Sequence, residues 1–199
     1  MTDNRLSRGE MTRNKIIQVA HDLFVNQGYH GTSMRQIAKG SKIALGGLYN
    51  HFASKEEVFK AVFLEYHPYQ EVMPRILDAQ GETVEEFVRD AFTRILQAVE
   101  DRPDFMNLMF IEVVEFNSLH AHEIFTTNLP RLMPTVQRLL QTAKDGTRSI
   151  PEPLFIRTLF GFIFGYFLTD IILGSQAPDG FREGAEQYFL DIYLHGILT

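Results

Sequence analysis

Apolar residues recur along most of the chain with the spacing of about 3.6 residues that is typical of amphipathic helices. The repeat runs from 12 to 27, and Gly28 is a natural place for this helix to end. A short helix is expected next, because Thr32 or Ser33 can cap its first turn. Another short helix follows over about 45–50. The first quarter of the chain is therefore predicted to hold three helices.

Ser54 is expected to begin a longer helix, since Glu57 stands three residues after it in the pattern of a capping box. Pro68 interrupts or ends this helix. Further helices are expected over about 70–79, 83–101, 103–117, 119–128, 131–144, 152–174 and 181–197. Prolines stand near the junctions: Pro103, Pro130, Pro134, Pro151, Pro153 and Pro178. No stretch alternates with the period of two that strands show, so the predicted fold class is all-α.

The composition is that of an ordinary globular protein. Of its 199 residues 45% are hydrophobic and 22% charged, which excludes intrinsic disorder and allows one domain or two small ones. The absence of cysteine excludes disulfides, thiolate zinc sites, iron–sulfur clusters and cysteine nucleophiles. The first ten residues are polar and lack the apolar core of a secretory signal, so we expect a cytoplasmic protein.

Charge is distributed unevenly along the chain. Residues 1–55 carry eight lysines and arginines against three acids, a net charge of +5. Because the whole chain carries −6, residues 56–199 carry −11. A basic end on an acidic body indicates that the first quarter meets a polyanion such as nucleic acid.

The arrangement of the first helices matches a helix-turn-helix, in which the last helix lies in the major groove of DNA. Within 32–52 the apolar positions are spaced for burial: Ile37, Ala38, Ile43, Leu48 and Phe52. Gly46 and Gly47 are unusual inside a helix, because each costs roughly 1 kcal/mol relative to alanine. A backbone pressed against DNA would explain both glycines.

Residues 12–63 resemble the TetR family of bacterial transcriptional regulators. The resemblance rests on Phe24, Gly28, Tyr29, Thr32, Ser33, Ile37, Ala38, Ile43, Gly46, Leu48, Tyr49, His51, Phe52, Lys55 and the Glu-Glu-Val-Phe that follows. It implies a homodimer with an N-terminal DNA-binding domain and a larger helical domain whose ligand changes the affinity for DNA. We assign the helix-turn-helix domain to 1–55, with an N-terminal arm over 1–10, and the effector-binding and dimerisation domain to 56–199.

The resemblance also implies the residues that contact DNA. Phosphate contacts are expected from Ser33, Tyr49, His51 and Lys55. Base contacts are expected from Lys42, Leu45, Gly46, Gly47 and Asn50, with Arg35 and Gln36 close by. Arg5 and Arg8 either form an arm that enters a minor groove or only solvate the terminus. The structural alternatives are a core aromatic for Tyr49, a structural histidine for His51 and a solvated surface lysine for Lys55.

Two residues of the turn depart from the family pattern. Lys42 stands where a glycine is usual, and lysine adopts a left-handed turn only with strain. Ala44 stands where a serine or threonine usually caps the recognition helix, and losing that cap costs about 1 kcal/mol. Since the helix also offers few long polar side chains, the residues do not predict an operator sequence.

The acidic body is rich in phenylalanine and methionine, which form a core or line an apolar pocket. Polar residues interrupt this pattern, and Glu112 and Glu115 share one helical face. These carboxylates are either exposed, ion-paired with an arginine such as Arg157, or in contact with a ligand. We expect a hydrophobic or aromatic effector. Its predicted contacts are Met109, Phe110, Glu112, Glu115, Phe116, His120, Phe160, Phe164 and Phe167.

The apolar run over 154–173 has the length of a membrane span, but Arg157 and Asp170 are costly in lipid. The family's last two helices pair with those of a second subunit, so we place the dimer on 152–174 and 181–197. The expected interface residues are Phe155, Gly161, Phe162, Gly165, Tyr188, Phe189, Ile192 and Tyr193.

Two other function classes were weighed. An enzyme is disfavoured, because the chain has no Glu-x-x-His pair, no phosphate-binding glycine loop and no nucleophile elbow. We accordingly expect no catalytic residue, metal or cofactor. The interpretation of the chain as a membrane-associated helical protein depends on the apolar run over 154–173 alone. The favoured function is a repressor that binds a palindromic operator as a homodimer and is released by a small molecule.

Overall fold

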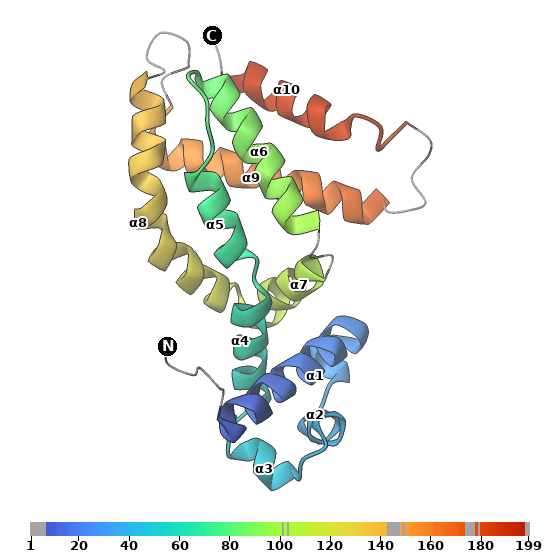
Figure 1. Ribbon diagram of the computed structural model, residues 1–199. Helices are drawn as coiled ribbons and strands as arrows, with labels where there is room; N and C mark the ends of the chain where they lie inside the picture. The colour runs from blue at the N-terminus through green and yellow to red at the C-terminus, as the bar shows by residue number, and fades with distance from the viewer. Residues whose placement is uncertain are drawn as a thin grey trace. The chain divides into compact units, whose positions relative to one another are not determined.

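In a computed structural model, the chain forms helices that are joined by short connections. The structure describes residues 7–100, 102, 104–142, 148, 150–173, 178 and 180–197, and among these it contains no strand. The helices are α1 (Arg8–Gly31), α2 (Met34–Ser41), α3 (Leu45–Tyr49), α4 (Lys55–Tyr66), α5 (Tyr69–Leu77), α6 (Val84–Glu100), α7 (Phe105–Phe116), α8 (Leu119–Thr142), α9 (Glu152–Leu173) and α10 (Ala185–Ile197) (Figure 1). The predicted all-α fold class is confirmed.

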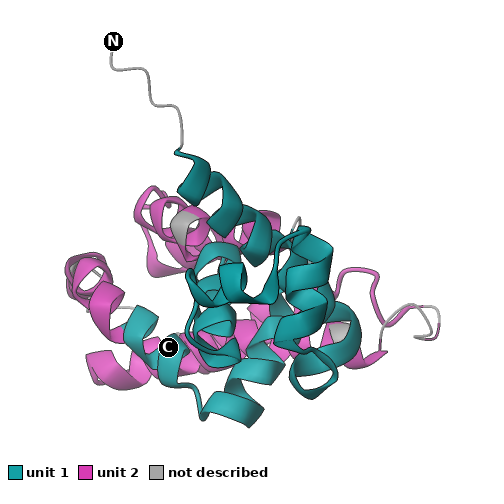
Figure 2. Ribbon diagram, turned by 90° about the horizontal axis from the view of Figure 1, so that it is seen from below, with its two compact units in different colours: residues 1–68, 102–125 teal, residues 69–101, 126–199 magenta. Residues whose placement is uncertain are grey.

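The helices belong to two compact units. Unit 1 comprises Met1–Pro68 and Arg102–Phe125, and unit 2 comprises Tyr69–Asp101 and Thr126–Thr199 (Figure 2). Unit 1 thus contains α7 and the start of α8 together with the four N-terminal helices.

Serine caps set the starts of α1 and α4. The Ser7 hydroxyl accepts a hydrogen bond from the Glu10 amide, and the Glu10 carboxylate accepts one from the Ser7 amide, so α1 begins at Arg8 rather than at 12. Arg8 therefore lies in α1 and not in a loose arm, whereas Arg5 lies outside the described residues. Ser54 caps α4 as expected, but the Glu57 carboxylate accepts from Ala53 instead of completing the box.

The helix end predicted at Gly28 is a kink within α1. Gly28 has φ 73° and ψ 175°, a conformation that is essentially restricted to glycine, and helical residues resume after it up to Gly31. The regular helix therefore ends where the apolar repeat ends, and the kink redirects the chain toward α2.

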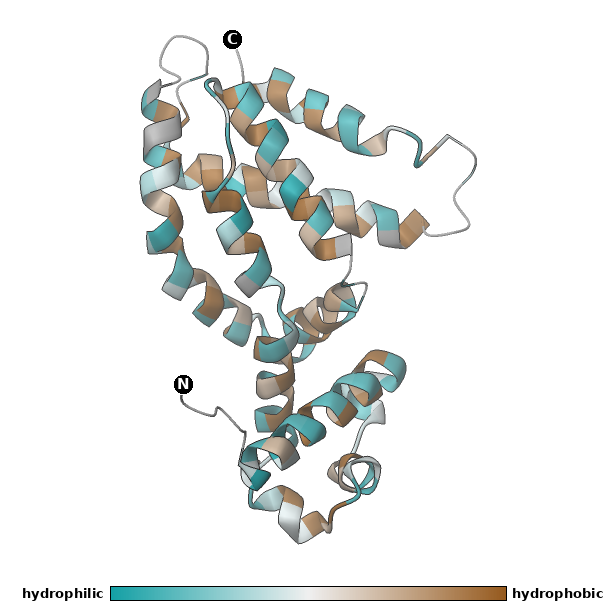
Figure 3. Cartoon of the chain, viewed as in Figure 1, coloured by the Kyte–Doolittle hydropathy of each residue, from teal (hydrophilic) through white to brown (hydrophobic). Residues whose placement is uncertain are grey.

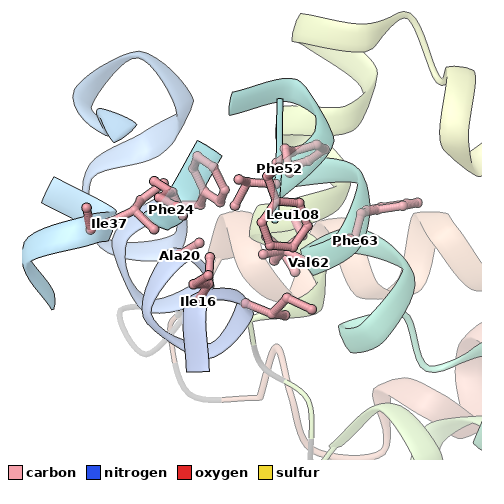
Figure 4. Packing of buried hydrophobic residues seen from close by; sticks show 14 residues of the cluster. Ile16, Ala20, Phe24, Ile37, Phe52, Val62, Phe63 and Leu108 are labelled. Atoms are coloured by element: carbon pink, nitrogen blue, oxygen red, sulfur yellow. The ribbon is translucent and has the colours of Figure 1, made fainter. Parts of the chain in front are cut away.

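The core of unit 1 joins α7 to the N-terminal helices. Figure 4 shows side chains of α1, α2, α4 and α7 meeting in one cluster, which includes Phe24 of α1, Phe63 of α4 and Leu108 of α7. Ile37, Ala38, Leu48 and Phe52 are buried as predicted, while Ile43 is partly buried. Because burying a phenylalanine contributes about 1.5–3 kcal/mol, this cluster holds the helix-turn-helix in place.

Unit 2 is held by apolar contacts among α6, α8, α9 and α10. Its buried cluster is formed by Val84, Val88, Phe92, Val136, Phe155, Ile156, Leu190, Leu194 and Ile197. An ion pair of 2.6 Å between Arg89 and Asp191 joins α6 to α10. Figure 3 shows that α9 is hydrophobic along most of its length. None of the helices among the described residues is long and apolar enough to cross a membrane.

Two predicted boundaries are wrong. The helices expected over 119–128 and 131–144 are one helix, α8, which contains Pro130 and Pro134. A proline inside a helix removes one amide donor and its ring clashes with the carbonyl four residues before it, but packing of the surrounding turns overrides that local cost. The last helix begins at Ala185 rather than 181.

Candidate nucleic-acid interface

The first turn of α2 is closed by two residues that were predicted to contact DNA. The Ser33 hydroxyl accepts from the Gln36 amide at 3.3 Å, and Gln36 Oε1 accepts from the Ser33 amide at 2.8 Å. The hydroxyl also donates to Gln36 Oε1 at 2.7 Å, and the Gln36 side-chain amide donates to Gln27. Both side chains are exposed, but each already has partners within the protein.

The turn between α2 and α3 shows both departures from the family pattern. Lys42 is left-handed, with φ 59° and ψ 41°, and the Ile43 amide donates back to the Ala38 carbonyl at 3.1 Å. A left-handed lysine costs roughly 1 kcal/mol, yet it leaves the Lys42 side chain exposed. Ala44 is the N-cap of α3 and provides no side-chain hydrogen bond, as predicted.

The helix α3 has a buried side and an open side. Leu48 is fully buried and Leu45 packs partly against the core of unit 1. On the open side, Gly46 and Asn50 are exposed and the Tyr49 side chain is 50% exposed, which excludes a core aromatic at Tyr49. Gly47 and His51 lie at the border between the two sides and are partly exposed.

Lys55 is not a solvated surface lysine. Its ammonium donates to the Tyr29 and Thr32 carbonyls at 2.8 and 3.0 Å and lies 4.0 Å from the centre of the Tyr29 ring. Partial burial lowers the pKa of Lys55, and the negative charge of Glu115 opposes this shift. These contacts join the start of α4 to the end of α1, while a phosphate contact from Lys55 stays a prediction.

Arg13 was counted in the charge balance but not selected as a site residue. Its guanidinium lies 4.9 Å from the centre of the Phe52 ring, which follows α3 in the chain. It is one of several exposed cations in the first quarter, which also include Arg8, Lys15, Arg35, Lys39 and Lys42. The cationic charge of Arg13 is visible in the sequence, but only the fold shows that this residue of α1 lies beside Phe52.

The predicted effector residues on α7 have partners within unit 1. The carboxylate of Glu112 is fully buried and accepts from the amides of His120 and Ala121 at 2.6 and 3.0 Å. The carboxylate of Glu115 forms a 2.7 Å ion pair with His30 of α1. Arg157, named as one alternative partner of these carboxylates, is exposed on α9 in unit 2.

The aromatic residues of the predicted effector site fall into both units. Phe116 stacks on Phe59 with 4.6 Å between ring centres, whereas Phe110 is 38% exposed. Met109 packs partly against the same core, and Phe160, Phe164 and Phe167 lie on α9 in unit 2. The positions of these residues do not test whether any of them contacts an effector.

The predicted dimer residues are divided between core and surface of unit 2. Phe155 is buried, and the ring of Phe162 stacks on that of Tyr193 at 4.7 Å. Phe189 is partly buried and its ring lies 5.4 Å from that of Tyr166. The remaining residues, Gly161, Gly165, Tyr188 and Ile192, are exposed or partly exposed.

Known proteins resemble this chain in the sequence of residues 16–62 and in the fold of nearly the whole chain. Residues 16–62 match the family model described as bacterial regulatory proteins, tetR family. The transcriptional regulator UidR of Escherichia coli K12 is 26% identical over 206 aligned positions that cover all of this chain and 99% of UidR. A TetR-family regulator from Cytophaga hutchinsonii has a TM-score of 0.70 at 17% identity, covering 98% of this chain and 99% of that one.

A third similar protein is the ketosteroid transcriptional regulator KstR2 of Mycobacterium tuberculosis. Its TM-score is 0.62 at 22% identity, and the alignment covers 94% of this chain and 95% of KstR2. The family match lies on the helices α1 to α4, where the helix-turn-helix geometry and the exposed cations were found. The chain thus resembles the TetR family of bacterial regulatory proteins, in sequence over residues 16–62 and in fold over nearly its whole length.

Proposed function

We propose that the protein is a cytoplasmic homodimeric repressor that binds a palindromic operator and is released by a hydrophobic or aromatic small molecule. In this proposal residues 1–55 bind DNA, while 56–199 bind the effector and form the dimer. Repression is the commoner mode in the family, and no residue of this chain distinguishes it from activation.

The observation that carries the DNA-binding role is the open side of α3 beside exposed cations. Gly46, Tyr49 and Asn50 face outward while Leu48 anchors the helix, so one surface of a short helix is free to enter a groove. Because residues 1–55 carry a net charge of +5, this end attracts the phosphate backbone.

The dimer is supported by exposed apolar side chains on the last two helices. On α9, Phe160 and Phe164 are 46% and 38% exposed and share one face at the spacing of successive turns. On α10, Tyr188 and Ile192 are 70% and 73% exposed and also share a face. Apolar groups gathered in this way mark interaction surfaces. A two-fold axis through them would set two α3 helices about 34–36 Å apart, as successive major grooves require.

The effector is proposed from the chemistry of the body. The regions 105–116 and 154–173 are dominated by apolar and aromatic residues, which suit an apolar ligand. The structurally similar KstR2 is named for ketosteroids, an apolar ligand class, which supports the same choice here. Such an effector would act only through its differential affinity for the DNA-bound and free arrangements of the protein.

The proposal is tested with the full-length protein and DNA fragments that flank its own gene. We expect a dimer in sedimentation, retention of one fragment that weakens steeply with salt, and release by an apolar compound from a panel of steroids, acyl chains and aromatic acids. A monomer at micromolar concentration that retains no fragment at low ionic strength would overturn the proposed function.

A further inference from the structure

The outward surface of α3 lacks polar side chains in its first turn. Ala44, Leu45, Gly46 and Gly47 carry no side-chain hydrogen-bond donor or acceptor. Ala44 and Gly46 are exposed, and Leu45 and Gly47 are partly exposed. The first polar side chains on this helix are those of Tyr49 and Asn50, at its end.

The two glycines are not required by the fold of the protein. A Cβ atom built on Gly46 or Gly47 meets no heavy atom within 4 Å. Neither residue has the positive φ that favours glycine. Because glycine weakens a helix relative to alanine, folding alone would favour alanine at both positions. The reason for glycine at these two positions therefore lies outside the free protein, where another molecule approaches the backbone of α3.

One polar candidate on α2, Gln36, has other partners. The Gln36 side chain caps α2 through Ser33 and donates to Gln27, so using it for base contacts would break these bonds. Lys42 and Asn50 stay exposed on either side of the segment 43–49, in which only Tyr49 has a polar group on its side chain.

The major groove offers one feature that an apolar surface recognises, the C5-methyl group of thymine. On the basis of the proposed function, we propose that the first turn of α3 reads thymine methyl groups through Ala44, Leu45 and the bare backbone of Gly46 and Gly47. The operator half-site therefore contains T·A pairs opposite this turn, without a guanine contacted by arginine there. The glycines let the helix approach closely enough for the short side chains to make this contact.

The first test replaces thymine by deoxyuracil, which removes only the methyl group. Duplexes are selected from a random pool with the full-length protein, and each thymine of the selected half-site is then substituted singly. We expect about fourfold weaker binding for each buried methyl that is removed. Thymines outside the half-site serve as controls and leave the affinity unchanged. Equal binding of all substituted duplexes overturns the proposed methyl readout.

The second test adds a methyl group to the protein. Gly46→Ala should raise the melting temperature of the free protein and weaken binding to the selected duplex by about tenfold, because the added group separates the helix from the bases. Thr93→Ala is the control, since Thr93 is exposed on α6, which carries none of the residues assigned to DNA or to the dimer, and alanine has the higher helix propensity. It should raise the melting temperature without weakening DNA binding.

The outcomes separate this inference from the proposed function. If Gly46→Ala binds DNA as tightly as the unmodified protein, close approach of the α3 backbone is overturned while repression of an operator stands. If no duplex at all is selected from the pool, the proposed function fails and the methyl readout fails with it.

Discussion

The carboxylate of Glu112 and the imidazole of His120 form a fully buried pair at the corner between α7 and α8. Glu112 Oε2 lies 2.9 Å from His120 Nδ1, while Oε1 accepts from two amides at the start of α8. Between them the chain turns through Asn117 and Ser118, both with positive φ. Glu112 therefore acts as the cap of α8, because its side chain accepts from the free amides of that helix end.

Removing this carboxylate should destabilise the protein. Glu112→Ala leaves two amides and an imidazole without their acceptor, so we expect a loss of about 3 kcal/mol in the free energy of unfolding by urea. Glu112→Gln keeps one oxygen acceptor and should lose about 1 kcal/mol.

Glu115→Gln is the matched control on the same helix. Its partner His30 has a side chain that is 79% exposed, and an ion pair with so exposed a partner contributes less than about 1 kcal/mol. If Glu112→Ala were as stable as Glu115→Gln, the cap would not contribute to the stability of the protein, and a ligand role for Glu112 would gain support.

Lys55→Ala should change both stability and DNA binding. The loss of the hydrogen bonds to the Tyr29 and Thr32 carbonyls and of the contact with the Tyr29 ring is expected to cost about 1–2 kcal/mol in urea denaturation. If Lys55 also touches a phosphate, affinity falls uniformly across DNA sequences and the salt slope flattens by about one unit.

Lys60→Ala controls for the general loss of a cation near the same helix. Lys60 pairs with the exposed Glu123 at 2.9 Å, so its removal should leave stability and the salt slope nearly unchanged. A normal slope together with lowered stability in Lys55→Ala would show that Lys55 is structural and contacts no phosphate.

The sequence is sufficient to predict those features of the structure that depend on residues close together in the chain. The apolar repeat indicates α1, α2 and α4, and Ser54 is correctly predicted to cap α4. Ser33 is one of the two residues predicted as candidates for the cap of α2, and Ala44 is correctly predicted to give α3 no side-chain cap. These features depend on residues within one helical turn, which a sequence displays directly.

Features that depend on distant segments were missed. The sequence predicts helix junctions near Pro130 and Pro134, whereas packing of the surrounding residues keeps α8 continuous. The Glu112–His120 pair and the ammonium of Lys55 on the α1 carbonyls join residues that only the fold brings together. In the same way, the resemblance named the residues around α3, but only the structure showed that Gln36 is occupied by the cap of α2.

Burial of His67 should make stability depend on pH. Its ring packs against those of Phe63 and Phe105, and desolvation lowers its pKa from 6.5 to about 4. Between these two values the unfolded chain binds a proton that the folded chain does not. The free energy of unfolding should thus fall as the pH falls from 6.5 to about 4, by up to about 1.4 kcal/mol per pH unit from this group.

His67→Phe should flatten that dependence when urea denaturation is repeated between pH 4 and 7. The exposed His195, whose ring nitrogen lies 2.7 Å from the Asp191 carbonyl, provides a control, and His195→Gln should keep the slope of the unmodified protein. An identical slope in His67→Phe would show that His67 is not the group responsible.

Ile192→Asp should prevent dimerisation. The Ile192 side chain is 73% exposed in the single chain, so the substitution leaves the core intact, whereas a dimer interface would have to bury an unpaired carboxylate. We expect a folded monomer in sedimentation and loss of operator binding. Gln187→Asp, at another exposed position of α10, is the control. A fully dimeric Ile192→Asp would place the interface elsewhere.

The same glycine-to-alanine substitution should have opposite effects at Gly28 and Gly46. Gly28 has φ 73° and ψ 175°, where a side chain is strained even though its Cβ would meet no atom within 4 Å. We expect Gly28→Ala to lower the free energy of unfolding by about 1–3 kcal/mol. Gly46→Ala, which meets neither strain nor neighbours, should raise it by about 0.5–1 kcal/mol. Equal effects at the two positions would mean that Gly28 does not form the kink that turns α1 toward α2.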